Sequence, residues 1–483
     1  MFVIVMTSLC LMPVYVESQV HVRRNDWAPD VKAAVNDFMD ACHNRPNAYA
    51  VFDFDNTTSI FDISLQLMPY QLKIMAFALT PELLESDFNN AVDLSVPLLR
   101  KMKEDICNDY RMLYKKYGPF TPAGVDETTA GRLEKDPYWL DFATKMLSFY
   151  DVMEEKQAVF DAYAWIQAWY DGMTERQVYD LAMRSHKKHQ VINTSEVTWK
   201  GPRLKTQAGA VDYTWTSGIQ VTENMKELWK ALHDNGIDVW VCSASDINVV
   251  RAAVDAFGLH NYCKGVVAMT AKLTPDGKYR LGYDYEDGCC YFTEPDERWT
   301  KGTAPSNALT AGPGKVTAIN NVLEPMYGGQ GPLAGFMDSS GDFNFCTEYK
   351  NLKLVICFNR ATRKVTEGGG LIAELAIYQR DVLGYNLRKA NEAGDTYYVL
   401  QGRDENGLRT FRPRNATLRF GQTGEKLFDG DENYRLLDYM KQHRMTTAQI
   451  INTFCLYKAK GDPDNPLPFA YGFLHSYAGY HSR

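Results

Sequence analysis

Two aspartates one residue apart, Asp53 and Asp55, follow the apolar run 50–52 and precede amide and hydroxyl side chains at 56–58. Such a run is typical of a buried parallel strand, and open α/β sheets bind ligands at the carboxyl ends of their strands. Residues i and i+2 of a strand face the same side, and two close carboxylates repel unless a proton or a cation lies between them. Mg²⁺ binds carboxylates together with phosphate oxygens. The spacing indicates a phosphoryl-transfer site, and the alternative is a solvated strand end that caps a helix.

Three further groups follow in a fixed order. Ser243 ends a second apolar run, 237–242, and Lys315 opens a predicted helix over 316–323. Asp338 and Asp342 lie four residues apart in a Gly/Ser-rich loop after an apolar approach. A hydroxyl can donate to a phosphate oxygen, and a lysine can place a point charge on a transferring phosphoryl group. Each group alone is typical of a loop, a helix start or a turn, whereas their joint order indicates one site.

This order of motifs resembles the haloacid-dehalogenase (HAD) superfamily of phosphatases. The matching segments are 53–57, Ser243, Lys315 and 338–342, and the resemblance extends over roughly residues 48 to 360. Segment 52–58 with the following Asp62, together with 241–245, looks most like the secreted phosphorylcholine phosphatases. The resemblance implies an α/β fold: a HAD-like doubly wound parallel sheet (Rossmann-like core) with a helical cap inserted after the first strand.

The resemblance also implies a role for each residue. Asp53 would attack phosphorus and carry an aspartyl phosphate, and Asp55 would act as general acid and then general base. The cofactor would be Mg²⁺, bound by the Asp53 carboxylate, the Asp55 backbone carbonyl and Asp338. The phosphate would be held by Thr57, Ser243 and Lys315, and Asp342 would support the metal loop.

The motif positions predict the domain organisation. Residues 61–215 are too many for a loop in a compact domain and carry helical patterning at 140–153 and 159–173. We expect a helical cap there, between the two parts of the catalytic core at 19–60 and 216–360. A helix over 224–235 and a hairpin over 273–285 are predicted in the core. Residues 361–483 are expected to form an α+β C-terminal extension, with a helix over 371–383 and a hairpin over 397–412.

The cap sequence bears on the substrate. It contains Tyr163, Trp165, Trp169 and Tyr170, and aromatic faces bind quaternary ammonium groups well. The same residues at helical spacing are typical of core packing. Asp62 could face a substrate cation or cap the first helix of the cap. Phosphocholine or phosphoethanolamine is therefore implied mainly by the resemblance.

Charge limits the class of partner. The chain has 483 residues and a formal net charge of −8. Nonspecific nucleic-acid binding relies on a basic surface, so we expect no nucleic acid as a partner. A small-molecule phosphomonoester as substrate is what the resemblance implies. The sequence does not indicate which oligomeric state the chain adopts.

The N-terminus and the cysteines bear on whether the chain is exported from the cytoplasm. The apolar run 2–16 is short for a bilayer span and fits a signal peptide over 1–18, so the chain is expected to be secreted or periplasmic without a stable membrane span. No Lys or Arg precedes the run, which leaves an upstream start or a buried strand as alternatives. Cys242 and Cys357 lie in apolar runs and are predicted to be buried thiols. The disulfide candidates are Cys42, Cys107, Cys263, Cys289, Cys290, Cys346 and Cys455.

Two other functions remain open at this stage. One is a broad-specificity acid phosphatase or a phosphoserine-type phosphatase with the same chemistry. The other is an inactive secreted binding protein on the same fold, which loss of a catalytic group would indicate. Asp53, Asp55, Ser243, Lys315 and Asp338 are all present, so we favour the enzyme.

Overall fold

The structure is a computed structural model. It describes residues 19–156, 159–284, 289–293, 298–301, 309–361, 368–407, 410–428, 431–454, 458–468 and 470. The predicted signal peptide, 1–18, lies outside these residues.

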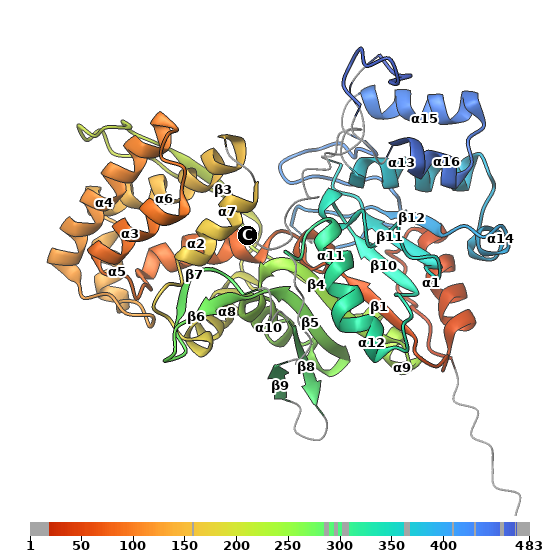
Figure 1. Ribbon diagram of the computed structural model, residues 1–483, viewed down its shortest axis with the longest axis horizontal. Helices are drawn as coiled ribbons and strands as arrows, with labels where there is room; N and C mark the ends of the chain where they lie inside the picture. The colour runs from red at the N-terminus through yellow and green to blue at the C-terminus, as the bar shows by residue number, and fades with distance from the viewer. Residues whose placement is uncertain are drawn as a thin grey trace, which may run out of the picture.

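An eight-stranded sheet forms the centre of the molecule (Figure 1), in the order β12-β11-β10-β1-β4-β5-β8-β9. Its strands are β1 (Tyr49–Phe52), β4 (Asp238–Asp246), β5 (Cys263–Met269), β8 (Cys289–Thr293), β9 (Arg298–Lys301), β10 (Ala334–Met337), β11 (Leu354–Phe358) and β12 (Tyr397–Gln401). The six strands from β12 to β5 are parallel, and β8 and β9 add an antiparallel edge. β1 lies between β10 and β4, so the chain order reverses there. In such sheets the ligand crevice lies at the carboxyl ends of the strands where the order reverses.

Helices cover both faces of the sheet because the central strands are apolar on both sides. Alternate residues of each strand belong to different cores: Phe52 packs in one core and Val51 in the other. Helices α1 (Pro29–Cys42), α9 (Glu223–Asp234), α10 (Ile247–Ala256) and α14 (Leu387–Glu392) contribute to the first core. Helices α11 (Pro313–Ala318), α13 (Gly368–Asp381), α15 (Asp431–His443) and α16 (Thr447–Phe454), with the π-helix η3 (Ile319–Leu323), contribute to the second. The predicted α/β fold with a doubly wound parallel sheet is confirmed.

Residues 63–217, where the cap was predicted over 61–215, form a mainly helical unit beside the sheet (Figure 1). Its elements are α2 (Ile63–Ile74), α3 (Pro81–Ala91), α4 (Pro97–Tyr117), α5 (Glu127–Leu133), α6 (Pro137–Lys156), α7 (Val159–Ala168), α8 (Glu175–His189) and the antiparallel strands β2 (Ser195–Trp199) and β3 (Tyr213–Ser217). The two strands were not predicted. Trp199 and Trp215 pack edge to face, with ring centroids 4.7 Å apart, which favours the pairing of β2 with β3.

Further short elements lie between the strands and helices of the core sequence. They are η2 (His260–Tyr262), β6 (Ala271–Leu273), β7 (Tyr279–Tyr283) and α12 (Glu324–Met326). β6 and β7 form an antiparallel hairpin where one was predicted over 273–285.

The C-terminal extension is joined to the core by a strand. β12 pairs in parallel with β11, from Leu354↔Tyr397 to Phe358↔Gln401. The predicted hairpin over 397–412 is therefore wrong for its first strand. All five residues of β12 are buried, as expected for a strand covered on both faces rather than for an exposed hairpin. Only an isolated antiparallel bridge joins Arg403 to Phe411.

The cysteines correct another prediction. Four of the disulfide candidates are buried free thiols: Cys42, Cys107, Cys263 and Cys346. Cys242 and Cys357 are also buried and free, as predicted. The side chains of Cys289 and Cys290, and all of Cys455, lie outside the described part of the structure.

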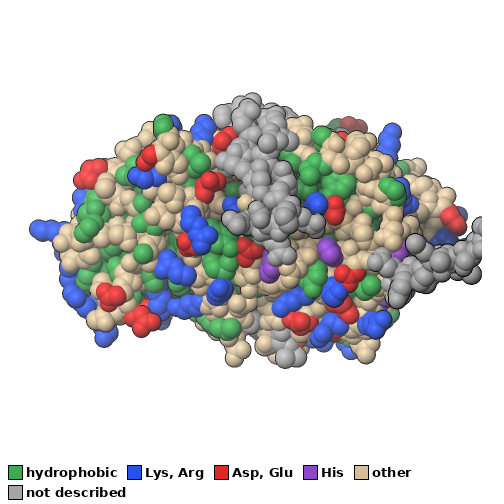
Figure 2. Space-filling model, turned by 90° about the horizontal axis from the view of Figure 1, so that it is seen from below, with side chains coloured by type: hydrophobic (Ala, Val, Ile, Leu, Met, Phe, Trp, Pro, Cys, Tyr) green, Lys and Arg blue, Asp and Glu red, His purple; other side chains and the backbone are tan. Residues whose placement is uncertain are grey.

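Lys and Arg side chains lie among Asp and Glu side chains on the face drawn in Figure 2. No helix within the described ranges is long and apolar enough to cross a membrane.

Candidate functional site

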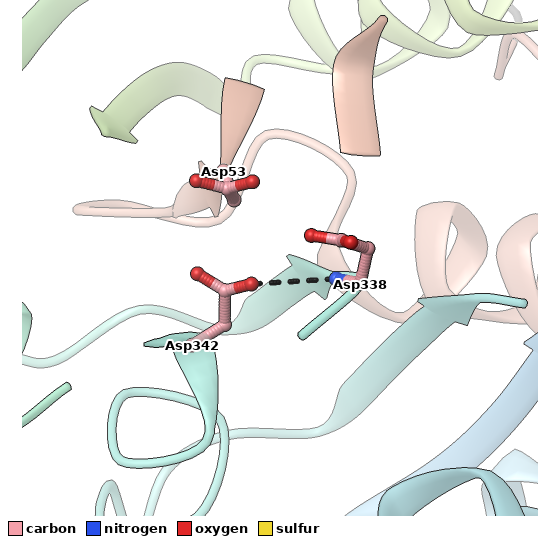
Figure 3. Close-up of side chains that lie close together, drawn as sticks. All are labelled: Asp53, Asp338 and Asp342. Carbon is pink, nitrogen blue, oxygen red and sulfur yellow. Dashed lines mark hydrogen bonds between the residues drawn. The ribbon is translucent and has the colours of Figure 1, made fainter. Parts of the chain in front are cut away.

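The predicted aspartates meet at the carboxyl ends of the central strands. β1 and β10 pair with Phe52 opposite Phe336, so Asp53 and Asp338 follow adjacent strands one residue apart in register. Asp342 lies in the short 3-10 helix η4 (Ser340–Asp342) of the following loop and turns back toward both (Figure 3). Its Oδ2 accepts hydrogen bonds of 3.3 Å from the backbone N–H groups of Asp338 and Ser339. Asp342 thus orders the loop that carries Asp338.

Lys315 joins two of these carboxylates. Its Nζ lies 2.7 Å from Asp53 Oδ1 and 2.6 Å from Asp342 Oδ1, and its side chain is 2% exposed. Gly314 explains how the lysine comes so close, because a Cβ there would lie 1.7 Å from the carbonyl oxygen of Leu309. Only glycine permits this approach of loop and helix start. The fixed backbone directs Lys315 from the first turn of α11 into the site.

The carboxylates Asp53, Asp338 and Asp342 form a group that fits a hard cation. One oxygen from each lies within 4.8 Å of the others, and all three residues are buried. Burial and the neighbouring Asp342 raise the pKa of Asp53 to about 8, although Lys315 opposes the shift. The lysine therefore does not balance the negative charge, and Mg²⁺, which prefers carboxylate oxygens, would. The residues present therefore fit Mg²⁺, the predicted metal.

Asp55 lies in η1 (Phe54–Thr58), the turn after β1, and lines the same cavity as Asp53. Its Oδ1 accepts a 2.7 Å hydrogen bond from the backbone N–H of Ile63, and its Oδ2 accepts one of 2.6 Å from the Ser245 hydroxyl. Burial, followed by the charges of Asp62 and Asp53, raises the pKa of Asp55 well above its usual value. A carboxyl group that is held in place and has a raised pKa is suited to general acid catalysis.

Ser245 was missed by the sequence analysis, which selected Ser243. β4 continues to Asp246 with an irregularity after Cys242, and Ser245 reaches the cavity whereas Ser243 does not. Ser243 is fully buried, and its hydroxyl accepts a 3.2 Å hydrogen bond from the Ser245 N–H. Thr57 is buried and donates to Asp338 Oδ1 at 3.2 Å. Neither Ser243 nor Thr57 lines the cavity; both brace residues that do.

The cavity has a volume of about 340 Å³ and lies between the sheet and the cap. The core supplies Lys315 and most of the acidic groups, and the cap supplies Asp62, Tyr150, Tyr163 and Gln167. Asp62 also lines it and caps α2, since its Oδ1 accepts from the backbone N–H of Leu65 at 2.8 Å. Both sequence interpretations of Asp62 are therefore compatible with its position.

The other cap aromatics pack in the core. Trp165, Trp169 and Tyr170 are each at most 1% exposed, so the core-packing interpretation holds for them and only Tyr163 lines the cavity. Arg360 is a further cavity residue that the sequence did not reveal. It follows β11, and its Nη1 lies 3.2 Å from Asp338 Oδ2.

No protein-family model and no curated protein matches the chain. A conserved functionally unknown protein from Anaerococcus prevotii DSM 20548 has a similar structure, with a TM-score of 0.63 and 22% identity over 84% of this chain and 100% of that chain. The two proteins share a fold.

Two other solved structures overlap more weakly. A phosphoserine phosphohydrolase-like protein from Francisella tularensis subsp. tularensis SCHU S4 gives a TM-score of 0.27 at 13% identity, over 64% of this chain and 87% of that chain. Cytosolic 5'-nucleotidase IIIB bound to cytidine gives 0.30 at 13% identity, over 70% and 82%. TM-scores this low carry no functional argument.

Proposed function

We propose that this chain is a Mg²⁺-dependent phosphomonoester hydrolase of the HAD type that works through an aspartyl phosphate. The observation that carries the proposal is the buried constellation of Asp53, Lys315 and Asp342 beside Asp338, with Asp55 held on the same cavity. Burying carboxylates so close together costs folding stability, so their presence favours a functional role. Perturbed carboxyl pKa values in a cavity are typical of catalytic groups.

The proposed reaction has two displacements. An oxygen of Asp53 forms a bond to phosphorus as the bond to the leaving oxygen breaks, and Asp55 gives its proton to that oxygen. A water molecule then attacks the phosphorus of the aspartyl phosphate, Asp55 takes a proton from it, and inorganic phosphate leaves with Asp53 restored. Lys315 holds a nonbridging oxygen and offsets charge. Mg²⁺, bound by Asp53, Asp338 and the Asp55 backbone carbonyl, would neutralise the phosphate and orient it for attack.

We further propose an amino-alcohol phosphate, such as phosphocholine or phosphoethanolamine, as substrate. Tyr150 and Tyr163 line the cavity beside Asp62, and an aromatic face with a nearby carboxylate suits an ammonium group. The Tyr150 hydroxyl also donates to Glu154 at 2.6 Å, so a second carboxylate lies near this wall. Export of the mature chain remains a proposal from the sequence.

The test is phosphate release by residues 19–483 with Mg²⁺, using phosphocholine, phosphoethanolamine, phosphoserine, a nucleoside monophosphate and p-nitrophenyl phosphate. We expect hydrolysis that EDTA abolishes and that Asp53→Asn reduces to background. Full activity of Asp53→Asn would refute the mechanism, and no hydrolysis of any substrate would favour an inactive binding protein. Equal rates on all substrates would instead favour a broad-specificity phosphatase, and a preference for phosphoserine would favour a phosphoserine-type enzyme.

Asp62→Asn tests the substrate assignment separately. Asparagine is as good a helix cap as aspartate, so α2 should remain intact while the charge is lost. We expect KM for phosphocholine to rise about tenfold, which corresponds to ~1.4 kcal/mol. KM for p-nitrophenyl phosphate, which has no cation, should stay unchanged, and an equal rise for both would remove Asp62 from substrate recognition.

A further inference from the structure

An arginine of the C-terminal extension contacts the catalytic turn directly. Arg403 is 2% exposed, and its Nη1 donates to the backbone carbonyl oxygen of Asn56 at 2.6 Å. Nη2 lies 3.3 Å from Asn56 Oδ1, and Nε and Nη2 donate to Glu405 Oε1 at 2.9 and 2.6 Å. One planar guanidinium thus joins a buried glutamate to a residue 347 positions earlier in the chain.

Asn56 is the residue whose conformation sets the turn. It lies between Asp55 and Thr57 and has a φ of +60°, in the left-handed region that L-residues rarely adopt. Its N–H donates to the carbonyl oxygen of Phe61 at 3.3 Å, and its own carbonyl accepts from Arg403. Both peptide planes that flank Asn56 are therefore held from outside. These planes determine where the Asp55 carbonyl and the Thr57 N–H point.

Arg403 is itself fixed in place. Its backbone N–H donates to the Thr417 hydroxyl at 3.1 Å, and its carbonyl accepts from the N–H of Leu418 at 3.0 Å. Gly402 permits this packing, since a Cβ there would lie 2.1 Å from the carbonyl oxygen of Ala416. Thr417 also donates to the carbonyl oxygen of Asn359, the residue before Arg360. The extension is thus packed rigidly against two loops of the site.

We infer that Arg403 is a positioning residue, which the C-terminal extension supplies to hold the catalytic turn at Asn56 in its active shape. It acts through the turn and touches no substrate atom. Arginine suits the task because its fork donates to Glu405 and to the Asn56 carbonyl at once, which a single ammonium cannot do. The kinetic part of the inference rests on the proposed phosphatase function, while its effect on metal binding does not.

The experiment replaces both members of the buried pair. Arg403→Gln alone would leave Glu405 buried without its counter-charge, so the main variant is Arg403→Gln/Glu405→Gln. The matched control is Arg388→Gln/Glu392→Gln, a pair at 4.0 Å in the same C-terminal extension whose two side chains are largely exposed. Steady-state kinetics and calorimetric titration of the metal-free proteins with Mg²⁺ are measured, with circular dichroism and Tm to establish folding.

We expect the main variant to lose about 10²-fold in kcat, as for a small misplacement of catalytic groups, with KM for p-nitrophenyl phosphate changed by less than about threefold. Its Kd for Mg²⁺ should rise about tenfold, because the Asp55 carbonyl is displaced. The control should retain both values. A main variant that matches the control in kcat and in Mg²⁺ affinity would overturn the inference.

A second variant keeps the test decisive if the double substitution prevents folding. Arg403→Lys retains the charge beside Glu405 but cannot also hold the Asn56 carbonyl, and we expect about a tenfold loss in kcat. Wild-type kcat and Mg²⁺ affinity in this variant would also overturn the inference. If wild-type protein hydrolyses no phosphomonoester, the proposed function fails, and the comparison of Mg²⁺ affinities still decides the role of Arg403.

Discussion

Ser245→Ala removes the side-chain hydrogen bond that holds Asp55 in the cavity. The hydroxyl lies 2.6 Å from Asp55 Oδ2, and the other carboxyl oxygen keeps its 2.7 Å bond from the N–H of Ile63. The variant therefore loosens the proposed general acid without removing it. The rate should fall for substrates whose leaving oxygen needs a proton from Asp55.

The magnitude follows from the geometry. A hydrogen bond to a charged group contributes about 1.5–3 kcal/mol to stability when both partners are well placed. Because the Ile63 bond still orients the carboxyl group of Asp55, we expect a loss just below this range in the transition state, about 1.4 kcal/mol, or tenfold in rate.

The assay compares two leaving groups. Choline leaves as a poor alkoxide and needs a proton from Asp55, whereas p-nitrophenolate is stable as an anion and needs little help. The quantity to compare is kcat/KM, which includes only the steps up to departure of the leaving group. For Ser245→Ala we expect about a tenfold fall in kcat/KM with phosphocholine and at most about a threefold fall with p-nitrophenyl phosphate.

Ser64→Ala is the matched control, because the Ser64 hydroxyl lies 3.1 Å from the Ser245 hydroxyl on the same cavity wall but has no bond to Asp55. It should change kcat/KM for the two substrates equally and by less. Equal losses for both substrates in Ser245→Ala, or no loss, would refute the assignment of Asp55 as an acid held by Ser245.

Three further predictions concern other parts of the site and cap. Gly314→Ala should lower kcat about 10²-fold in steady-state kinetics, because it shifts Lys315. Gly131→Ala is the control, since a Cβ there meets nothing within 4 Å, and it should leave kcat unchanged. In the cap, burial and the adjacent Asp171 raise the pKa of Asp87 to about 8, so the folded chain keeps a proton that the unfolded chain releases. Stability should thus fall as pH rises from about 4 to 8, by up to ~1.4 kcal/mol per pH unit, and Asp87→Asn should flatten this fall in urea titrations at each pH. Mg²⁺ at a hundred times its Kd should stabilise the protein by about 2.7 kcal/mol in urea titrations, and EDTA should reverse the gain.

The sequence predicted what depends on local pattern. An apolar run before Asp53 indicates a buried strand, and apolar runs before Ser243 and Asp338 indicate two more, so the gathering of these residues at one sheet edge follows from strand polarity alone. Lys315 was predicted at a helix start, and α11 begins at Pro313. Because parallel strands present their carboxyl ends at the same edge of a sheet, the residues that follow them are predicted to lie close together even when no contact is known.

The sequence could not predict contacts that depend on packing over long separations. Arg403 meets Asn56 only because β12 joins the sheet beside β11, and no local pattern distinguishes such a strand from one arm of a hairpin. Ser245 reaches Asp55 because β4 is irregular after Cys242, which changes the side that the following residues face. Cysteine count likewise says nothing about distance, and the thiols in the described part of the chain are buried and free.

The charge distribution of the cavity connects the chemistry with the choice of substrate. The carboxylates that line it outnumber the two cationic side chains, Lys315 and Arg360; they are Asp53, Asp55, Asp62, Asp246, Asp338 and Asp342. A phosphate dianion would be repelled without an added cation, which is the role that the proposed Mg²⁺ would have on the core side.

The remaining excess of negative charge in the cavity lies toward the cap. Asp62 caps α2, and Asp246 accepts from Gln167 of α7 at 3.4 Å. A zwitterionic substrate would therefore be oriented by the field, with its phosphate toward Lys315 and the metal and its ammonium group toward Asp62. Such orientation brings the leaving oxygen to Asp55, between the two ends, so the acidic wall of the cap would contribute to catalysis as well as to binding.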